Sequence, residues 1–508
     1  MGLYLYMQMW HRLFFLGAAS VLVAVVSCNR DNTNGSDPND MVTTEDLSGG
    51  VGDGGDTSGD MTGTAGDMTA SLALTGASPA QGPTTGNIDV TLTGSGFLTG
   101  ATVTIDGQAA TVKSVSQNQI VVTLPARPGV KGLVTVVVTN PGGRAAMSGI
   151  IFGYYYGTIT FDPAAKISVG GSPYNIAVSE LENNLKVDLV ATDNSSTGQI
   201  FTLSGNGDGT FLPVAKYPAG TSAYGLKVLD LNADGFNDVV VTNFTNSAGV
   251  SLLTNSKTGT FPSRTPVGSG DLPLSVDVKD INGDGNLDMI VANSGGGSNN
   301  ITLLTGKAGG TFNAPVPLVA GNVPRHVQFV DVNKDGKTDI VAANESSANV
   351  SVLIGDGAGN FAAKKDYPAG AGPYTVLAND FNADGILDLL VCASKDSTVA
   401  LLTGNGDGTF ANPKTTSIGT AMMSSPTNIA LGDVNGDGRL DVVSAIYADQ
   451  KIGITLNNNG AFGTTSTLSA IGFPRGVAAA DLNGDGKTDI VSANSGDGSI
   501  SVFLNRSQ

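Results

Sequence analysis

The chain has 508 residues and a formal net charge of −18, with 14% charged residues and 70 glycines. Such an acidic chain lacks the basic surface that nucleic-acid binding requires, so we expect no nucleic-acid partner. Two cysteines are too few for a disulfide framework or a cysteine-rich zinc site, and many glycines with little charge predict short strands and tight turns rather than long helices.

Residues 1–27 have the features of a secretory signal peptide. The apolar run 13–26 is too short to cross a bilayer, and it ends in Val25-Val26-Ser27-Cys28. That ending resembles the bacterial lipoprotein box, which implies cleavage before Cys28 and lipidation of its thiol. We therefore expect a protein lipid-anchored to the bacterial envelope, in the outer membrane and facing outward. An ordinary signal peptide with a chance cysteine is the alternative.

A stalk is expected between the anchor and the first folded domain. Residues 29–74 carry nine acidic residues and one base, Arg30, and show no apolar periodicity. Such a segment cannot bury a core. Residues 28–74 are therefore predicted to be the lipidated cysteine and a disordered acidic stalk.

Residues 75–153 alternate strand-like runs with turn residues, which predicts a small β-sandwich. The strongest runs are 88–97, 101–107, 119–126 and 132–143. The segment resembles the IPT/TIG immunoglobulin-like domain. The matching residues are Ser78-Pro79, Gly82 to Gly86, Thr93 to Phe97, and Asn140 to Gly143. The resemblance implies a spacer or interaction module.

The rest of the chain is a repeat. The pattern Asp-x-Asn-x-Asp-Gly-x-x-Asp occurs complete six times, after a degenerate copy that runs from Glu180 to Asp188, at intervals of 48 to 53 residues. Each copy precedes two aliphatic runs, a Gly-rich turn ending in Phe, and a fourth short run. Four short strands per repeat predict seven blades of a β-propeller. Because the chain stops before a fourth strand in the last repeat, we expect residues 157–171 to complete that blade and close the ring.

Residues 157–508 resemble the FG-GAP/VCBS repeat propellers, the fold of integrin α-subunit heads. The fold class is thus predicted to be all-β, with an immunoglobulin-like sandwich followed by a seven-bladed propeller. Cys392 falls where other repeats have a small residue, as at Ala343, and is expected to be a core residue.

The repeated loop presents side-chain oxygens at alternate positions, with a glycine for the sharp turn, which suits calcium. Three carboxylates within nine residues would repel one another without a cation. Turns capped by Asp and Asn without an ion are the alternative. Whether the degenerate first loop binds calcium stays open, because Leu185 replaces the glycine. The predicted calcium ligands are Asp230, Asn232, Asp234, Asp238, Asp280, Asn282, Asp284, Asp288, Asp331, Asn333, Asp335, Asp339, Asp380, Asn382, Asp384, Asp388, Asp433, Asn435, Asp437, Asp441, Asp481, Asn483, Asp485 and Asp489.

A second group of residues varies at one position of the repeat, just where the first strand of each blade begins. In the family, ligands meet the face built by the loops that lead into these strands. Tyrosines and arginines that converge there would suit an acidic or sugar-like ligand, although the same residues could pack against neighbouring blades or line an idle channel. The predicted ligand-binding residues are Tyr174, Tyr224, Arg325, His326, Tyr374 and Arg475.

The domain order favours a cell-surface lipoprotein that binds a protein or polysaccharide through a calcium-stabilised propeller, in adhesion or recognition. A structural envelope component is the alternative. A glycan-active enzyme is less favoured, because no histidine cluster, nucleophile motif or separate acid pair stands out, so we expect no catalytic residues.

Overall fold

The computed structural model describes residues 72–508, apart from 129–131, 144, 247–248, 296–299 and 419–424. The predicted signal peptide, Cys28 and most of the predicted stalk lie outside the described residues. Every regular element in the described part is a strand, and no helix there is long and apolar enough to cross a membrane.

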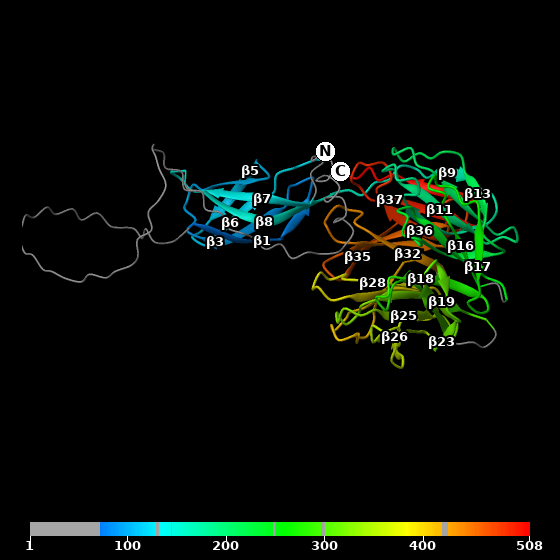
Figure 1. The fold of residues 1–508 in the computed structure, drawn as a ribbon. Coiled ribbons are helices and arrows are strands. Elements are labelled where there is room, and N and C mark those ends of the chain that lie inside the picture. The colour runs from blue at the N-terminus through cyan, green and yellow to red at the C-terminus, as the bar shows by residue number, and fades with distance from the viewer. Residues whose placement is uncertain (1–71, 129–131, 144, 247–248, 296–299, 419–424) are drawn as a thin grey trace, which may run out of the picture. The chain divides into compact units, whose positions relative to one another are not determined.

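The N-terminal domain is one hydrogen-bonded sheet folded over a single core (Figure 1, blue to cyan). The strand order is β1-β3-β6-β5-β4-β7-β8-β2, and β5 pairs with β6 at one end and with β4 at the other, so it joins the two layers. The strands are β1 (Ala73–Ser78), β2 (Gln81–Pro83), β3 (Asp89–Ser95), β4 (Thr102–Ile105), β5 (Gln108–Val115), β6 (Gln119–Thr123), β7 (Gly132–Thr139) and β8 (Ala145–Tyr155).

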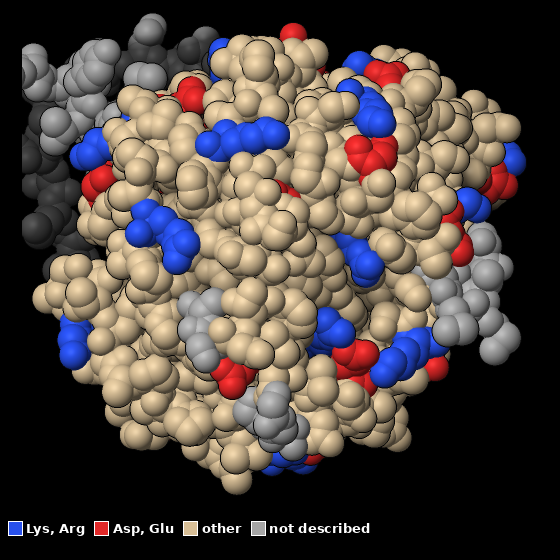
Figure 2. Space-filling model, turned by 90° about the vertical axis from the view of Figure 1, so that its right-hand side faces the viewer, with Lys and Arg blue, Asp and Glu red and all other residues tan. Residues whose placement is uncertain are grey.

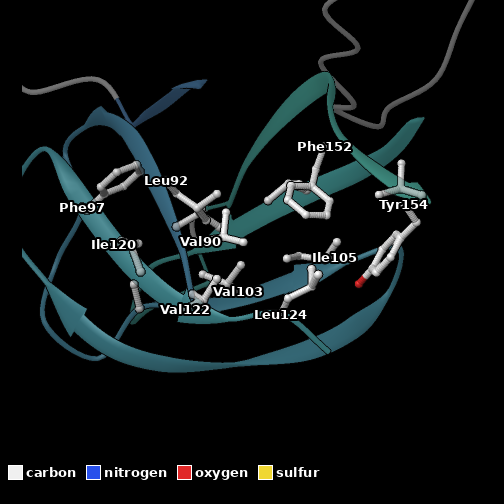
Figure 3. Close-up of a cluster of buried hydrophobic side chains, with 14 residues drawn as sticks. Val90, Leu92, Phe97, Val103, Ile105, Ile120, Val122, Leu124, Phe152 and Tyr154 are labelled. Carbon is white, nitrogen blue, oxygen red and sulfur yellow. The ribbon is translucent and has the colours of Figure 1, made fainter. Parts of the chain in front are cut away.

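Alternation along these strands builds the core. Val90 and Leu92 on β3, Ile120 and Val122 on β6, and Phe152 on β8 are fully buried and face one another (Figure 3). Along β3 and β6 the neighbouring residues are more exposed, as the two-residue period of a strand requires. The sandwich predicted from these runs is confirmed.

The second domain consists of seven four-stranded antiparallel sheets (Figure 1, green to red). The first strand of each sheet contacts the first strands of the neighbouring sheets, and β36 contacts β10, so the sheets close into a ring. The first strands are β10 (Pro173–Ser179), β14 (Ala223–Leu229), β18 (Pro273–Lys279), β24 (Pro324–Val330), β28 (Pro373–Asn379), β32 (Pro426–Gly432) and β36 (Pro474–Ala480). The second strands are β11 (Asp188–Asp193), β15 (Asp238–Asn243), β19 (Asp288–Asn293), β25 (Asp339–Asn344), β29 (Asp388–Ala393), β33 (Asp441–Ile446) and β37 (Asp489–Asn494).

The outer half of each blade is built in the same way. The third strands are β12 (Gln199–Leu203), β16 (Val250–Leu253), β20 (Asn300–Leu304), β26 (Asn349–Leu353), β30 (Thr398–Leu402), β34 (Lys451–Asn457) and β38 (Ser499–Phe503). The fourth strands are β13 (Ala215–Pro218), β17 (Arg264–Val267), β23 (Val316–Val319), β27 (Lys365–Pro368), β31 (Lys414–Ser417), β35 (Phe462–Ser469) and β9 (Ala165–Ser168). Blade three also has a small hairpin of β21 (Gly306–Lys307) and β22 (Thr311–Phe312).

The ring closes as the sequence predicts. The outer strand of the last blade is β9, which precedes the first blade in the chain and pairs with β38, with Ile167 opposite Ile500. The third strand of blade seven, β38 (Ser499–Phe503), is therefore hydrogen-bonded on both of its edges. The seven-bladed propeller is confirmed.

The cores lie between neighbouring blades. The second strands are buried along their whole length, and each hydrophobic cluster joins two adjacent blades: Leu189 and Ala191 of blade one pack with Val491, Ala493 and Ile500 of blade seven. A blade therefore cannot bury its apolar faces alone, which is typical of repeat folds.

The closing strand pair generates a stability prediction. Ile500→Ala removes a fully buried side chain where blades seven and one meet, so it should lower the free energy of unfolding by about 2–5 kcal/mol. Ile471→Ala is the control, because Ile471 is 36% exposed and lies in none of the buried clusters. Urea unfolding of both variants measures the difference, and equal midpoints would contradict the closure argument.

Candidate functional site

The last aspartate of the repeated loop, position nine, begins the second strand of every blade. In all seven blades both of its carboxylate oxygens accept a backbone N–H at 2.7–3.1 Å. One N–H comes from position two of the loop, the other from the turn after the third strand. These residues are at most 1% exposed: Asp188, Asp238, Asp288, Asp339, Asp388, Asp441 and Asp489. The carboxylate thus ties three chain segments of one blade together.

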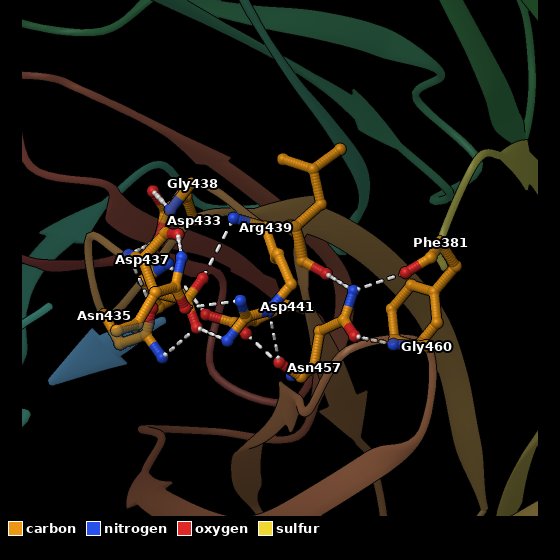
Figure 4. Close-up of polar contacts among 12 residues, drawn as sticks. Phe381, Asp433, Asn435, Asp437, Gly438, Arg439, Asp441, Asn457 and Gly460 are labelled. Atoms are coloured by element: carbon orange, nitrogen blue, oxygen red, sulfur yellow. Dashed lines mark hydrogen bonds and ion pairs between the residues drawn. The ribbon is translucent and has the colours of Figure 1, made fainter. Parts of the chain in front are cut away.

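The turn residue that donates to this aspartate is a glycine or an asparagine. At Gly355, for example, a Cβ would lie 2.0 Å from the carbonyl oxygen of Thr338, so no larger residue fits that backbone. Where asparagine takes its place, the side chain reaches the preceding blade: Asn457 Nδ2 donates to Phe381 O at 2.7 Å, as Figure 4 shows. Asn255 and Asn505 make the equivalent bonds. We call the position-nine aspartate, together with the turn residue that donates to it, the clamp. Where the turn residue is asparagine, the clamp therefore also joins neighbouring blades.

The other loop positions form a ladder of short turns. In all six complete loops the position-one Asp accepts the N–H of the position-six Gly, the position-three Asn accepts the N–H of position five, and the position-five Asp accepts the N–H of position seven. Figure 4 shows this ladder at Asp433, Asn435, Asp437 and Gly438. Positions four and six have positive φ throughout, which explains the glycine at position six.

The donor set of these loops fits calcium, although no group of three or more His, Cys, Asp or Glu side chains in the described residues is gathered closely enough to hold a metal. The buried Oδ1 of Asp331 has no hydrogen-bond partner among them, which is an acceptor to which a cation could bind. Burial, with smaller contributions from the Asp437 and Asp433 carboxylates, raises the pKa of Asp441 to about 7. Carboxylate and amide oxygens in a tight loop are the ligands that Ca²⁺ prefers.

The degenerate first loop keeps the same shape with different groups. Leu185 takes a φ of +62° at position six, its N–H donates to Glu180, and its side chain is 85% exposed. Glu182 at position three accepts hydrogen bonds from Ser204 and Asn184. The acidic groups of this loop are thus occupied by protein donors.

The predicted ligand residues meet at the opposite end of the first strands. All seven residues at the second position of these strands line one cavity of about 60 Å³, which we call the mouth of the propeller. The mouth residues are Tyr174, Tyr224, Leu274, Arg325, Tyr374, Thr427 and Arg475. The structure thus brings together every residue predicted for ligand binding, and His326 lines the same cavity.

Three tyrosines close the centre of the mouth. The hydroxyls of Tyr174, Tyr224 and Tyr374 lie 2.5–2.6 Å from one another. Burial, and then the neighbouring tyrosines, raise the pKa of Tyr174 and Tyr224 well above the ordinary value, so these hydroxyls stay protonated. They act as a neutral plug across the axis.

Charged groups surround this plug. Arg325 stacks over Tyr374 at 4.8 Å and pairs with Glu345 at 2.6 Å, and Lys395 approaches the same carboxylate at 3.2 Å. Burial opposes the charge of Arg325, but Tyr374, Tyr224 and Glu345 outweigh it and raise its pKa. For Glu345, burial is likewise outweighed by Arg325 and Lys395, which hold its pKa below the usual range.

Aromatic rings and a guanidinium form a stack beside the tyrosine plug. Arg475 lies 3.5 Å from the ring centre of Tyr447 and 5.4 Å from that of Tyr174. Tyr174 packs on Tyr224 at 4.1 Å, and Tyr447 packs on Phe473 at 5.3 Å. The guanidinium therefore has aromatic neighbours that fix its plane.

His326 and Cys392 are both enclosed by protein. Burial lowers the pKa of His326 to about 4, and its buried Nδ1 has no partner among the described residues. The imidazole is therefore neutral near pH 7. Cys392 is fully buried within the core of blades five and six, as expected, and burial raises its pKa.

Sequence reasoning missed the outer members of this site. Glu345 and Tyr447 are the residues directly after the second strands of blades four and six, and Phe244 holds that place in blade two. Because a second strand ends where the first strand begins, these residues also reach the mouth. Comparing the repeats at the residue directly after the second strand would have identified these positions from the sequence.

A larger hollow lies away from the mouth. A hollow of about 650 Å³ lies along the outer strand of blade two and the turn of blade three, lined mainly by uncharged residues such as Pro266, Val267 and Phe312. On the face drawn in Figure 2, basic and acidic side chains are scattered rather than gathered into a patch of one sign.

The comparison with protein families decides what this architecture is. The model described as FG-GAP-like repeat matches residues 181–241, 230–291, 280–342, 331–391, 380–444 and 433–492, a continuous stretch longer than half of the chain. The chain belongs to the FG-GAP-like repeat family. The IPT/TIG domain model matches residues 72–156 in front of the FG-GAP-like repeats. No curated protein sequence matches the chain significantly.

Solved structures similar to this FG-GAP-like chain share little sequence with it. An auxiliary nutrient binding protein from Bacteroides ovatus is 13% identical, with a TM-score of 0.45 over 86% of this chain and 98% of that chain. An Agrocybe aegerita lectin that recognises non-reducing terminal N-acetylglucosamine is 16% identical, with a TM-score of 0.42 over 80% and 98%. Kuenenia stuttgartiensis hydrazine synthase is 14% identical, with a TM-score of 0.46 over 68% and 98%.

The clamp generates a prediction that separates it from metal binding. Asp388→Asn replaces one of the two acceptor oxygens by an amide group, so a buried N–H loses its partner and stability should fall by about 1–3 kcal/mol. The loss should persist in EDTA, because both hydrogen bonds of the carboxylate form without an ion.

Asp384→Asn in the same loop is the matched control. Asp384 is an acid at position five, with Asn382 as its near neighbour, and is exposed. In EDTA this change should have little effect on unfolding in urea. If Asp388→Asn does not lower stability in EDTA, the clamp does not stabilise the blade.

Proposed function

We propose that the protein is a surface recognition lipoprotein whose propeller binds a protein or polysaccharide partner at its mouth. The supporting observation is that variable tyrosine and arginine residues from separate blades converge on one small area. Residues there differ from blade to blade, while the clamp residues at the other end of the blades are constant. Variation limited to one end of a repeat is typical of a binding face.

In this proposal calcium holds the loops at the other end. The six complete loops would each bind one ion through the oxygens of positions one, three and five and a backbone carbonyl, with the position-nine aspartate contributing a remaining lone pair. The ion offsets repulsion among carboxylates of one loop and has no catalytic role. The protein is not an enzyme on this proposal.

The location follows from the N-terminal motif. Lipidation of Cys28 would anchor the chain in the bacterial envelope, in the outer membrane and facing outward, with the acidic segment as a spacer. The net negative charge of the chain agrees with a partner other than nucleic acid.

A structural envelope component is the second candidate. It is favoured by the tyrosine plug, because the three hydroxyls satisfy one another and leave a cavity of only about 60 Å³. Pockets for small molecules usually measure about 300–1,000 Å³. A partner at the mouth would therefore rest on it rather than enter it.

Binding of the full chain to acidic and neutral polysaccharides and to purified envelope proteins tests the proposal. Arg325→Ala combined with Arg475→Ala should abolish binding, because it removes both guanidinium groups of the mouth. Loss of the Arg325–Glu345 pair should also lower the melting temperature, so melting in calcium checks that the variant is still folded at the temperature of the assay. Binding that survives this double change would assign recognition to another surface. A folded protein that binds no member of the panel would favour the structural role.

Calcium should stabilise the full chain. A ligand that binds only the folded state raises stability by about 2.7 kcal/mol at 100 times its Kd. We expect millimolar calcium to raise the melting temperature and EDTA to reverse the effect, with Asp384→Asn weakening the response and Lys364→Gln, outside the loops, leaving it unchanged. An identical melting temperature in calcium and in EDTA would overturn the calcium proposal.

A further inference from the structure

The guanidinium of Arg475 is the least compensated charge at the mouth. Its face lies against Tyr447, and Tyr174 lies further off, but no hydrogen bond or ion pair from its N–H groups to any described residue is present. Stacking covers the face of a guanidinium and leaves its edge, which carries the five N–H donors, free to bind.

The other charges of the mouth do not neutralise it. Glu345 is held by Arg325 and Lys395, so this group of three already has an excess of one positive charge. Arg475 adds a second. Within the described residues, arginines elsewhere such as Arg127 and Arg506 are paired with an aspartate. This local positive excess lies on a chain whose net charge is −18.

The tyrosine plug limits what can bind beside Arg475. Three hydroxyls that bond to one another in a ring use all three of their protons, so none is left to donate to a ligand. The cavity of about 60 Å³ accepts a group of a few heavy atoms but not a sugar ring. The rings of Tyr174 and Tyr224 are stacked on each other at 4.1 Å, so they offer little free face to a sugar.

We propose that Arg475 binds an anionic oxygen group of the ligand, a carboxylate or a sulfate, at the edge of its guanidinium. The tyrosine plug forms the floor of this subsite, and Arg325 with Lys395 adds longer-range attraction. This inference rests on the proposed function and narrows it: the partner is recognised by an acidic group rather than by the stacking of a sugar ring. Planar donors of arginine match the two oxygens of such a group.

Titration calorimetry of the calcium-loaded full chain tests the proposal with defined probes. Methyl glucuronide carries a carboxylate, methyl glucoside is its neutral counterpart, and sodium sulfate provides the other anion, all at constant ionic strength. We expect the glucuronide or sulfate to bind and the glucoside not to bind. Arg475→Gln should weaken anion binding at least about tenfold, because charge-assisted hydrogen bonds are lost.

Two further variants keep the test specific. Arg475→Lys keeps the charge but loses the planar donors, so it should recover only part of the affinity. Arg264→Gln removes an exposed arginine of β17 and should leave affinity unchanged. Melting temperatures in calcium check that each variant is folded. Equal loss in Arg264→Gln and Arg475→Gln, or equal binding of glucuronide and glucoside, would overturn the anion subsite.

The results also separate this inference from the proposed function. If a polysaccharide or protein partner binds at the mouth but Arg475→Gln leaves its affinity and salt dependence unchanged, the anion subsite is wrong and the recognition function stands. If sulfate or glucuronide binds through Arg475 while no member of the partner panel does, the subsite stands and the recognition function is wrong.

Discussion

The propeller depends on one buried carboxylate per blade. The position-nine aspartate accepts N–H groups from the start of the loop and from the turn after the third strand, so it fixes three segments that hydrogen bonds of the sheet alone leave independent. Removing a charge from water is costly unless it gains good hydrogen bonds, and here both oxygens gain them. The clamp is present in blade one as well, at Asp188, although the other acids of that loop have changed. The loop shape is therefore built around the clamp, and a cation would be an addition to it.

The two ends of each blade are under different structural constraints. At the loop end, position four and position six need a left-handed backbone, and the neighbouring turn packs closely: a Cβ on Gly460 would lie 2.4 Å from the Cβ of Asn382 in the preceding blade. At the mouth, the second residue of each first strand lines the cavity and can be tyrosine, leucine, arginine or threonine. Because the constant residues at the loop end hold the blade together, the residues at the mouth can vary.

The sequence predicts the architecture well because the repeat encodes it locally. The aliphatic run that follows each copy of the loop pattern forms a strand, as at β19 (Asp288–Asn293), and the closing strand Ala165–Ser168 lies within the predicted segment 157–171. In the sandwich, β5 and β8 were not among the strongest runs, because β5 is half-exposed and carries Lys113, and β8 contains Gly149 and Gly153. Their strand state comes from pairing with β6 and β7, which is tertiary information.

The candidate site was only partly predictable, for a physical reason. Spacing shows that Tyr174, Tyr224 and Tyr374 occupy equivalent positions, but it does not show that their hydroxyls meet and close the axis. Equally, the pattern Asp-x-Asn-x-Asp marks oxygens suited to a metal, but it does not show that the ninth residue turns inward to backbone N–H groups. Both outcomes depend on side-chain directions set by the closed ring.

The closing strand also has a consequence for the order of assembly. Ser168 pairs with Ser499, so the strand made before the first blade must wait for nearly the whole domain to be synthesised before its partner exists. Contacts so distant in sequence slow folding, because a long loop must close before the contact forms. Blades one to six can pack in order as they emerge, whereas the seventh remains a three-stranded sheet with an open edge until the two ends of the domain meet. The final step of folding is therefore a search by the ends of the domain for each other, and the chain is most open to mispairing during that interval.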